Sequence, residues 1–447
     1  GGSTYQYLWF HSSQFFMNGC KDRDKNFIFA RIKSPLNQFS LMKFLHTSDW
    51  HLGHSLYNFD RTTEQQAFLK QLTEAVRTHQ PDALLVSGDI YHYSSPSAST
   101  QRMYTDAMLA IHEACPTMQI VVTAGNHDSS SRLETDSNLW KHFRVQVIGN
   151  IERKDDRILW EKHIVPLTDT SGKLTGYVIA VPHCYPQNFP ALHPDVPRDE
   201  RQTDFFRTLL QETGKRNTAG VPVILMAHLA VAGSDITGHD ETVGGMDYLP
   251  VETLGEGYDY LALGHIHCPQ TLRETERFAR YCGSPLPVSF DEAYPHSITC
   301  VELVRHGDTP TLEIIPIDNP IPLVTLPKAP APFDTARKEL QAFPADRPAY
   351  IRLNVLLKDY LSPDCNEQAS QAVRNKACRF CYIRTQRESS ATSAPAPSLN
   401  IQELKEQSPL DVADRYFEEA TGEPMDDELR RLLKTVVDTV REEQQLQ

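Results

Sequence analysis

The sequence lacks three features that would each have placed the protein in a different class. It has no run of about 18 apolar residues, so it predicts no membrane span. Its nine cysteines are scattered and odd in number, which indicates reduced thiols in a cytoplasmic protein rather than a secreted disulfide scaffold. Positive charge is scarce, since 44 Lys and Arg stand against 58 Asp and Glu, for a formal net charge of −14. That balance argues against a protein that binds nucleic acid through an overall positive charge, although bound divalent metal ions would supply positive charge locally.

From Met42 the chain alternates strand-like and helix-like stretches. Apolar runs predict strands at 43–47, 83–86 and 119–123, with helices at 63–78 and 98–114 between them. Five later strands, with fewer helices between them, are predicted at 176–181, 223–226, 260–263, 280–282 and 297–304. This pattern favours an α/β fold in which two sheets form a sandwich with helices outside, rather than one doubly wound sheet.

Composition also divides the chain. The first 41 residues have neither the order of a signal peptide nor a clear period, and we expect Met42 to be the functional start. A cluster of prolines at 316–332 marks a boundary, and a stretch rich in Ser, Ala and Pro marks a linker. The predicted organisation is an extension at 1–41, a main domain at 42–315, a small α+β domain at 316–387, a linker at 388–407 and helices at 408–447.

Short polar motifs follow the predicted strands at five places. Ligands of α/β proteins gather beyond the carboxyl ends of strands, so we expect these motifs to converge. Gly88, Gly125 and Gly264 each precede a polar residue, where a missing side chain allows a sharp turn and leaves room for an ion. Any one motif alone would fit an ordinary turn, but five at equivalent positions indicate a shared site. Its candidate ligands are Asp49, His51, Asp89, Asn126, His228, His265 and His267.

The chemistry of these side chains narrows the choice of ion. Asp, His and Asn without Cys suit Mn²⁺, Fe²⁺ or catalytic Zn²⁺ better than a structural thiolate zinc site. Seven ligands are too many for one ion, whereas two ions that share a carboxylate would use them all. Two metal ions roughly 3.5–4 Å apart are typical of enzymes that cleave phosphate esters.

The order D-x-H, G-D, G-N-H-D, H and G-H-x-H resembles the calcineurin-like metallophosphoesterase superfamily. Within this superfamily, four runs of the sequence resemble the SbcD family of bacterial nuclease subunits. They are MKFLHTSDWHLG at 42–53, GNHDS at 125–129, YCGSP at 281–285 and SFDE at 289–292. The resemblance is strong from Met42 to about Glu292. After Glu292 it rests only on the arrangement of the predicted domains. It implies a four-layer α/β/β/α sandwich, a small α+β capping domain and a C-terminal helical segment that binds a partner.

The resemblance also implies a role for each motif residue. One metal ion would be held by Asp49, His51 and His267 and the other by Asn126, His228 and His265, with Asp89 bridging. His127 would contact the phosphate and help to protonate the leaving oxygen. His92 matches a histidine of archaeal and eukaryotic relatives at a position where many SbcD sequences have Asp. It either assists catalysis or is an exposed loop residue.

The function that this resemblance implies is DNA phosphodiester hydrolysis. The expected activities are 3′→5′ double-strand exonuclease and endonuclease, with hairpin cleavage, dependent on two divalent ions of which Mn²⁺ is the best candidate. The expected partners are DNA and an SbcC-like ATPase with a coiled coil, in a heterotetramer that contains a nuclease homodimer. The expected role is DNA recombination, replication and repair in the cytoplasm.

Two other functions stay open from the sequence. A phosphatase or a small-molecule or cyclic-nucleotide phosphodiesterase of the same superfamily would use the same ligands, but it would need neither a small domain nor detached helices. A catalytically silent scaffold is disfavoured by the complete ligand set. The terminal helices either dock onto their own domain or grip the ATPase. Arg379 and its basic neighbours form either an ordinary charged face or a contact for DNA phosphate. His54 is expected to be a solvated loop residue.

Overall fold

The computed structural model describes residues 41–154, 157–193, 195–238, 248–272, 278–357 and 360–387, together with 410, 413–414, 417, 425–426 and 429–435. The predicted extension lies outside these residues apart from Leu41, as do the linker and most of the predicted terminal helices. The described residues form two compact units, one within Gly1–Thr325, Phe343–Arg352 and Val373–Tyr382 and the other within Leu326–Ala342, Leu353–Ala372 and Ile383–Gln447. The division into domains at 315 and 387 stays a prediction.

Two six-stranded sheets build the core of the first unit. In spatial order the first consists of β16 (Thr311–Pro316), β15 (Ser297–Leu303), β1 (Met42–Thr47), β4 (Ala83–Ser87), β5 (Gln119–Thr123) and β6 (Val145–Ile148). The second consists of β13 (Gln270–Leu272), β14 (Ala279–Tyr281), β12 (Tyr260–Gly264), β11 (Val223–His228), β10 (Leu174–Ala180) and β9 (Ile164–Thr168). Within each sheet, four strands run parallel: β1, β4, β5 and β6 in the first, and β10, β11, β12 and β14 in the second.

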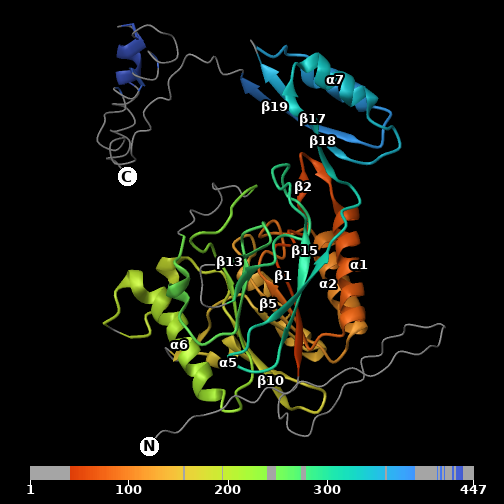
Figure 1. The fold of residues 1–447 in the computed structure, drawn as a ribbon. Coiled ribbons are helices and arrows are strands. Elements are labelled where there is room, and N and C mark those ends of the chain that lie inside the picture. Colours follow the sequence, from red (N-terminus) through yellow and green to blue (C-terminus); the bar gives the residue numbers. More distant parts are fainter. Residues whose placement is uncertain are drawn as a thin grey trace, which may run out of the picture. The chain divides into compact units, whose positions relative to one another are not determined.

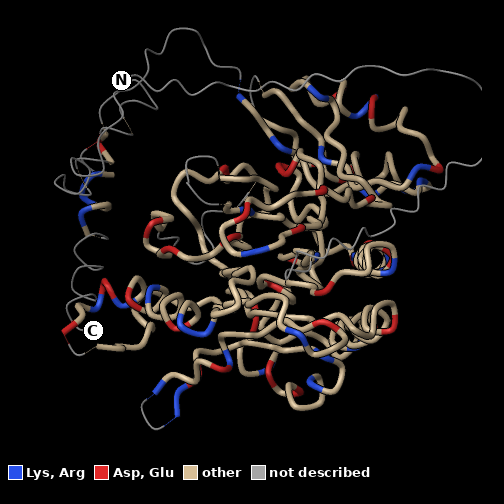
Figure 2. Tube along the Cα trace, turned by 60° about the horizontal axis from the view of Figure 1, so that its bottom comes forward, with Lys and Arg blue, Asp and Glu red and all other residues tan. Residues whose placement is uncertain are grey.

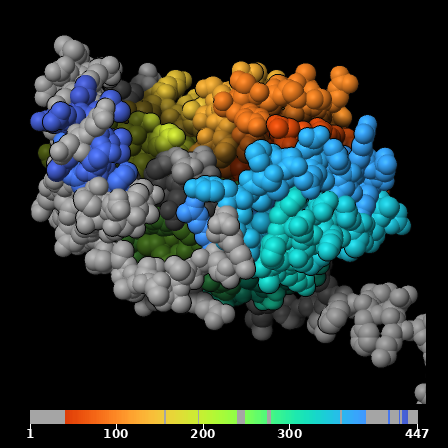
Figure 3. Space-filling model, turned by 90° about the horizontal axis from the view of Figure 1, so that it is seen from above, coloured from red at the N-terminus to blue at the C-terminus, as the bar shows by residue number. Residues whose placement is uncertain are grey.

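Helices cover the outer face of each sheet (Figure 1). On the first sheet these are α1 (Thr62–His79) and α2 (Ala98–Ala114), whose apolar faces share one core with the sheet. They lie side by side, and their orange side chains form a continuous surface in Figure 3. On the second sheet they are α5 (Trp160–His163) and α6 (Arg201–Arg216).

A third apolar core, which includes Phe44, Val178 and Tyr260, lies between the two sheets. The order of layers is therefore helix, sheet, sheet, helix, and the predicted α/β/β/α sandwich is confirmed. Strands buried on both faces need apolar side chains at successive positions, which is why β4 reads Ala-Leu-Leu-Val-Ser with every residue buried. The strands end where the sequence turns polar.

Short elements connect the layers of the first unit. They are the hairpins β2 (Ser55–Leu56) with β3 (Phe59–Asp60) and β7 (Arg153–Lys154) with β8 (Arg157–Ile158), the helices α3 (Ser130–Leu133) and α4 (Ser137–Trp140), and the 3₁₀ turns at Lys141–Phe143, Pro186–Asn188, Arg198–Glu200 and Val251–Leu254.

The small α+β part of the chain contains a three-stranded sheet and two helices. The strands are β17 (Leu323–Ala331), β18 (Tyr350–Leu357) and β19 (Arg379–Arg387), in that spatial order, and the helices are α7 (Phe333–Ala342) and α8 (Cys365–Val373). The prolines that predicted a boundary extend into β17, which is an edge strand and can therefore tolerate them. Among the described residues, no helix is both long and apolar enough to cross a membrane.

Candidate metal centre

The polar motifs meet where strands of both sheets end. Asp49 and His51 follow β1, Asp89 follows β4, and Asn126 follows β5 of the first sheet. His228 is the last residue of β11, and His265 and His267 follow β12 of the second sheet. The structure thus brings all seven predicted ligands to one place between two sheets. Within this group, the donor atoms of Asp49, His51 and His267 lie within 4.8 Å of one another, as do those of Asp49, Asp89 and His228.

Glycines make this convergence possible because the neighbouring chain occupies the space of a side chain. A Cβ on Gly264 would lie 1.9 Å from the carbonyl oxygen of Ser87. A Cβ on Gly125 would lie 2.0 Å from Oδ1 of Asp89, and one on Gly88 would lie 2.2 Å from Nδ1 of His228. Each motif glycine therefore lets one ligand-bearing segment approach another more closely than any larger residue would.

Several ligands also have an unusual backbone conformation. The φ angles of Asp49, His51, Asp89 and His265 are 53°, 45°, 51° and 97°, in the left-handed region that non-glycine residues seldom adopt. Backbone hydrogen bonds hold these turns: the amide of Asp49 donates to the carbonyl of Gly88, and that of His51 to the carbonyl of Asp89, both at 3.0 Å. Such strain clusters at functional sites, where the surrounding structure imposes it.

The first half of the site contains two histidines whose nitrogens face each other. Nε2 of His51 lies 3.1 Å from Nε2 of His267. Nδ1 of His267 lies 3.0 Å from Oε1 of the buried Glu292, and because a carboxylate accepts, Nδ1 carries the hydrogen. In a neutral His267 ring, Nε2 then carries a lone pair that points toward His51. A carboxylate behind a ligating histidine is a common feature of metal sites, since it fixes the tautomer and raises the basicity of the ligand.

The second half is built in the same way around His228. Its Nδ1 donates to the carbonyl oxygen of Ser87 at 2.8 Å, so Nε2 of the neutral ring is an acceptor. This Nε2 lies 3.0 Å from Oδ1 of Asn126 and 3.4 Å from Oδ2 of Asp89. Nδ1 of His265 lies 3.0 Å from the same Asn126 oxygen. The lone pair of a neutral His228 Nε2 and the oxygens of Asn126 and Asp89 are acceptors that repel one another unless a cation lies among them, so the residues present fit bound metal ions.

The pKa shifts of the buried histidines and of Asp89 are consistent with this geometry. Burial alone would lower the pKa of His228, but the adjacent carboxylate of Asp89 raises it to about 9. The pKa of His267 is likewise lowered by burial and raised by Glu292, again to about 9. Burial raises the pKa of Asp89, and the nearby His228 outweighs burial, so the net pKa lies well below the ordinary value. The carboxylates of Asp89 and Glu292 therefore favour positive charge at the histidines that they contact.

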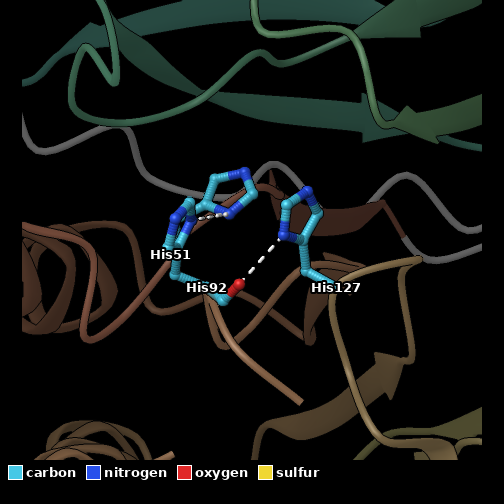
Figure 4. A group of neighbouring side chains, drawn as sticks. All are labelled: His51, His92 and His127. Carbon is cyan, nitrogen blue, oxygen red and sulfur yellow. Dashed lines mark hydrogen bonds between the residues drawn. The ribbon is translucent and has the colours of Figure 1, made fainter. Parts of the chain in front are cut away.

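The two predicted catalytic histidines lie together beside His51 (Figure 4). The His92 and His127 rings stack at 5.3 Å between centroids, and Nδ1 of His92 is 3.4 Å from Nδ1 of His51. Nδ1 of His127 donates to the carbonyl oxygen of His92 at 2.9 Å, and its backbone amide donates to Oδ1 of Asp89. His92 is partly buried, so it differs from the exposed loop residue that was one of its two predicted alternatives.

Most of the predicted ligands and both predicted catalytic histidines line a pocket of about 220 Å³. Its walls consist of His51, His54, Asp89, His92, Asn126, His127, Gly238, His265, His267, Val288 and Ser289. Pockets for drug-sized ligands usually occupy roughly 300–1,000 Å³. This smaller pocket therefore suits one phosphate group with the atoms attached to it better than a whole dinucleotide.

Three residues of the site were not assigned a role from the sequence. His54 was expected to be solvated, but it is partly buried in the pocket wall, so that prediction is wrong. Glu292 orients His267, as described above. Asp128 accepts hydrogen bonds from the backbone amides of Ile90, Tyr91 and Gly125, and so joins the turns after β4 and β5. Its place directly after the Gly-Asn-His run was the one available signal for Asp128.

Comparison with protein families gives two matches. Residues 42–269 match the model described as calcineurin-like phosphoesterase. Residues 319–421 match the model described as type 5 capsule protein repressor C-terminal domain.

Curated relatives match over most of their length. The SbcD subunit of the nuclease SbcCD from Rhodobacter capsulatus is 35% identical over 319 residues, which cover 69% of this chain and 77% of the relative. The protein of the same name from Bacillus subtilis strain 168 is 29% identical, with 90% and 99% covered. That from Escherichia coli K12 is 27% identical, with 78% and 86% covered.

Proposed function

We propose a detailed function from the finding that this chain belongs to the calcineurin-like phosphoesterases and, among them, to the SbcD family of nuclease subunits. The chain is a metal-dependent nuclease that hydrolyses phosphodiester bonds. The observation that carries the proposal is the convergence of seven hard-to-borderline ligands around one small pocket. A binding module or a silent scaffold would have no need of this complete set.

The division of ligands between two ions follows the two halves of the site. Asp49, His51 and His267 would hold one divalent ion and Asn126, His228 and His265 the other, with Asp89 bridging. Mn²⁺ is the ion we propose, because the set contains oxygen and imidazole ligands but no thiolate. Bound ions of this kind supply Lewis acidity for the attack of water on the phosphodiester.

We propose that His127 acts on the substrate. Its Nδ1 hydrogen is committed to the carbonyl of His92, which leaves Nε2 as the nitrogen that can exchange a proton with the leaving oxygen. His127 protonates that oxygen only when it carries hydrogens on both nitrogens. His92 stacks on the His127 ring, and we propose that it assists catalysis by fixing the orientation of His127.

DNA is the proposed substrate, although bulk charge does not attract it. Lys and Arg are interspersed with Asp and Glu along the described parts of the chain (Figure 2). The proposed site therefore relies on bound ions and local contacts. The 3′→5′ exonuclease polarity, the endonuclease and hairpin cleavage and the roles in recombination, replication and repair are proposals that rest on membership of the family.

The proposed partner is an SbcC-like ATPase with a coiled coil, bound through the segment 408–447. The relatives are named as subunits of SbcCD, and the C-terminal family model reaches residue 421. A nuclease homodimer within a heterotetramer is part of the same proposal. So is a location in the cytoplasm, which is supported by eight described cysteines that are all free thiols.

The full chain, with Mn²⁺ and with or without the ATPase partner, should be incubated with end-labelled duplex DNA and separately with bis(p-nitrophenyl) phosphate. The proposal expects cleavage of both substrates and no activity when the metal is chelated. Hydrolysis of the small ester with DNA left intact, even with the partner present, would favour the phosphatase or small-molecule phosphodiesterase alternative.

A further inference from the structure

His54 has a hydrogen-bond partner that determines where its proton lies. Nη1 of Arg61 is 3.3 Å from Nδ1 of His54. A guanidinium group only donates, so Nδ1 of His54 must accept. A neutral imidazole has one donor and one acceptor nitrogen, and the hydrogen of His54 is therefore on Nε2. A charged His54 ring would point an N–H group at the Arg61 cation.

Arg61 is itself held in place by buried groups. It is 2% exposed, its Nη1 donates to the carbonyl oxygen of Pro287 at 2.6 Å, and its Nε lies 3.4 Å from Oε1 of Glu64. The same carboxylate oxygen of Glu64, which is fully buried, accepts the Tyr350 hydroxyl at 2.8 Å. Buried, paired charges have few alternative arrangements, so Arg61 keeps its donor directed at His54.

The backbone of His54 is fixed as well. Its amide donates to the carbonyl oxygen of His51 at 3.0 Å, and its carbonyl oxygen accepts from Nε2 of Gln65 at 3.3 Å. Its ring meets that of His92 edge-on, with centroids 4.5 Å apart. No hydrogen bond joins Nε2 of His54 to any residue that the structure describes, and His54 lines the pocket with His92 and His127.

We propose that His54 is a substrate-binding residue whose Nε2–H donates a hydrogen bond to a non-bridging oxygen of the phosphodiester in this pocket. Arg61 acts as a positioning residue that keeps the hydrogen of His54 on Nε2. The inference rests on the proposed phosphodiesterase function and adds a hydrogen-bond donor to a non-bridging oxygen, since Nε2 of His127 is assigned to the leaving oxygen and its Nδ1 hydrogen is committed to a carbonyl. The ligand is the anionic phosphate group, which accepts strong charge-assisted hydrogen bonds.

Two substitutions separate donation from packing. In His54→Leu the donor is lost, and in His54→Gln the amide oxygen can accept from Arg61 while the amide nitrogen donates to the pocket. His142→Leu removes an exposed imidazole from the 3₁₀ turn Lys141–Phe143 and is the matched control. Each variant is assayed on bis(p-nitrophenyl) phosphate and on end-labelled duplex DNA at saturating Mn²⁺, after its metal content and melting temperature have been compared with the wild type.

The expected result is a KM for both substrates that rises by roughly 10- to 100-fold in His54→Leu, with kcat changed by less than about threefold, because the bond binds ground state and transition state alike. His54→Gln should recover most of that loss, and His142→Leu should match the wild type. An unchanged KM in His54→Leu overturns the proposal. A His54→Gln variant as impaired as His54→Leu also overturns it, because shape rather than donation would then matter.

A second measurement does not depend on activity. In metal-free protein labelled with ¹⁵N-histidine, the His54 resonances are assigned by their absence in His54→Gln, and their shifts report which ring nitrogen carries hydrogen. The proposal expects hydrogen on Nε2, and hydrogen on Nδ1 overturns it. If the wild type hydrolyses the small ester but not DNA, the nuclease proposal fails while the KM comparison on the ester still tests His54.

Discussion

The Nδ1 atom of His267 lies 3.0 Å from Oε1 of Glu292, a residue whose side chain is fully buried and which lies 25 residues further along the chain. The contact fixes which nitrogen of His267 faces His51, and through it the site depends on a residue that binds no ion itself.

Glu292→Gln should weaken metal binding by roughly 10- to 100-fold, because an amide neither fixes the His267 tautomer nor raises its basicity as a carboxylate does. Isothermal titration of metal-free protein with Mn²⁺ measures the change. Glu302→Gln, which removes a carboxylate that pairs with Lys43 at 2.9 Å, is the control. Equal affinity for Mn²⁺ in Glu292→Gln and Glu302→Gln would show that Glu292 does not contribute to metal binding.

Asp89→Asn should reduce metal-dependent hydrolysis of both substrates by about 100-fold or more, because the residue assigned to bridge two ions would lose its charge. The same variant should bind fewer ions per chain, which elemental analysis after dialysis measures. Asp308→Asn changes a carboxylate that pairs with Arg305 at 2.9 Å and should leave activity and metal content unchanged. Retained activity in Asp89→Asn would refute the assigned ligand set.

Gly264→Ala should lower the free energy of unfolding by roughly 1–3 kcal/mol, because the new Cβ would lie 1.9 Å from the backbone oxygen of Ser87. Gly214→Ala in α6 is the opposite case. Outside the backbone of its own helix, no atom of the described residues lies within 4 Å of its added Cβ, and alanine in a helix is favoured over glycine by up to about 1 kcal/mol. The urea concentration at the midpoint of unfolding should therefore fall for Gly264→Ala and rise for Gly214→Ala. Shifts of the midpoint in the same direction would contradict this account of the packing.

Glu134→Gln should lower stability at pH 7 by about 1 kcal/mol and have little effect in acid. Burial raises the pKa of Glu134, but Lys162 and the amides of Gly149 and Asn150 outweigh burial and bring it below the ordinary value of 4.5. A carboxyl group with a depressed pKa stabilises the fold above its unfolded-state pKa, and this contribution is lost as the pH falls through the folded-state pKa. The urea midpoints of the wild type and Glu134→Gln should converge as the pH is lowered from 7 to 3. A difference between the two midpoints that stays constant over this range would contradict the charge assigned to Glu134.

Deletion of residues 400–447 should leave hydrolysis of the small ester within about twofold of the wild type and abolish co-purification with the ATPase partner, because helices of this length are seldom stable alone and need a surface to pack on. Deletion of residues 1–41 is the control and should spare both properties. Survival of the complex after the C-terminal deletion would place the partner interface elsewhere on the chain.

The sequence predicted the layers well because each strand at the site is an apolar run that ends in a polar residue. α2 (Ala98–Ala114) and β5 (Gln119–Thr123) were predicted with the bounds that they have in the structure. α6 was not predicted, although Phe205, Phe206, Leu209 and Leu210 have helical spacing and are buried. β17 was missed because its prolines masked an edge strand.

Within the site, the grouping of ligands could be expected from their order, whereas the second layer of contacts could not. Glu292 reaches His267 only because the chain after β14 folds back over the turn that follows β12. His54 is near Arg61 because the β2–β3 hairpin reverses the chain between them, and no local pattern gives the orientation of either side chain. Burial of polar residues depends on such distant partners, so the prediction of a solvated His54 failed.

The left-handed conformations of Asp49, His51, Asp89 and His265 restrict how this family of sites can vary. Asn, Asp and His are enriched in that region of φ among residues other than glycine, while β-branched and bulky residues are disfavoured. Cys or Glu could serve chemically as ligands at these positions, but the turns favour the shorter Asp and the planar His. Any replacement must suit both the ion and the local backbone, so the number of acceptable sequences is smaller than coordination chemistry alone would allow.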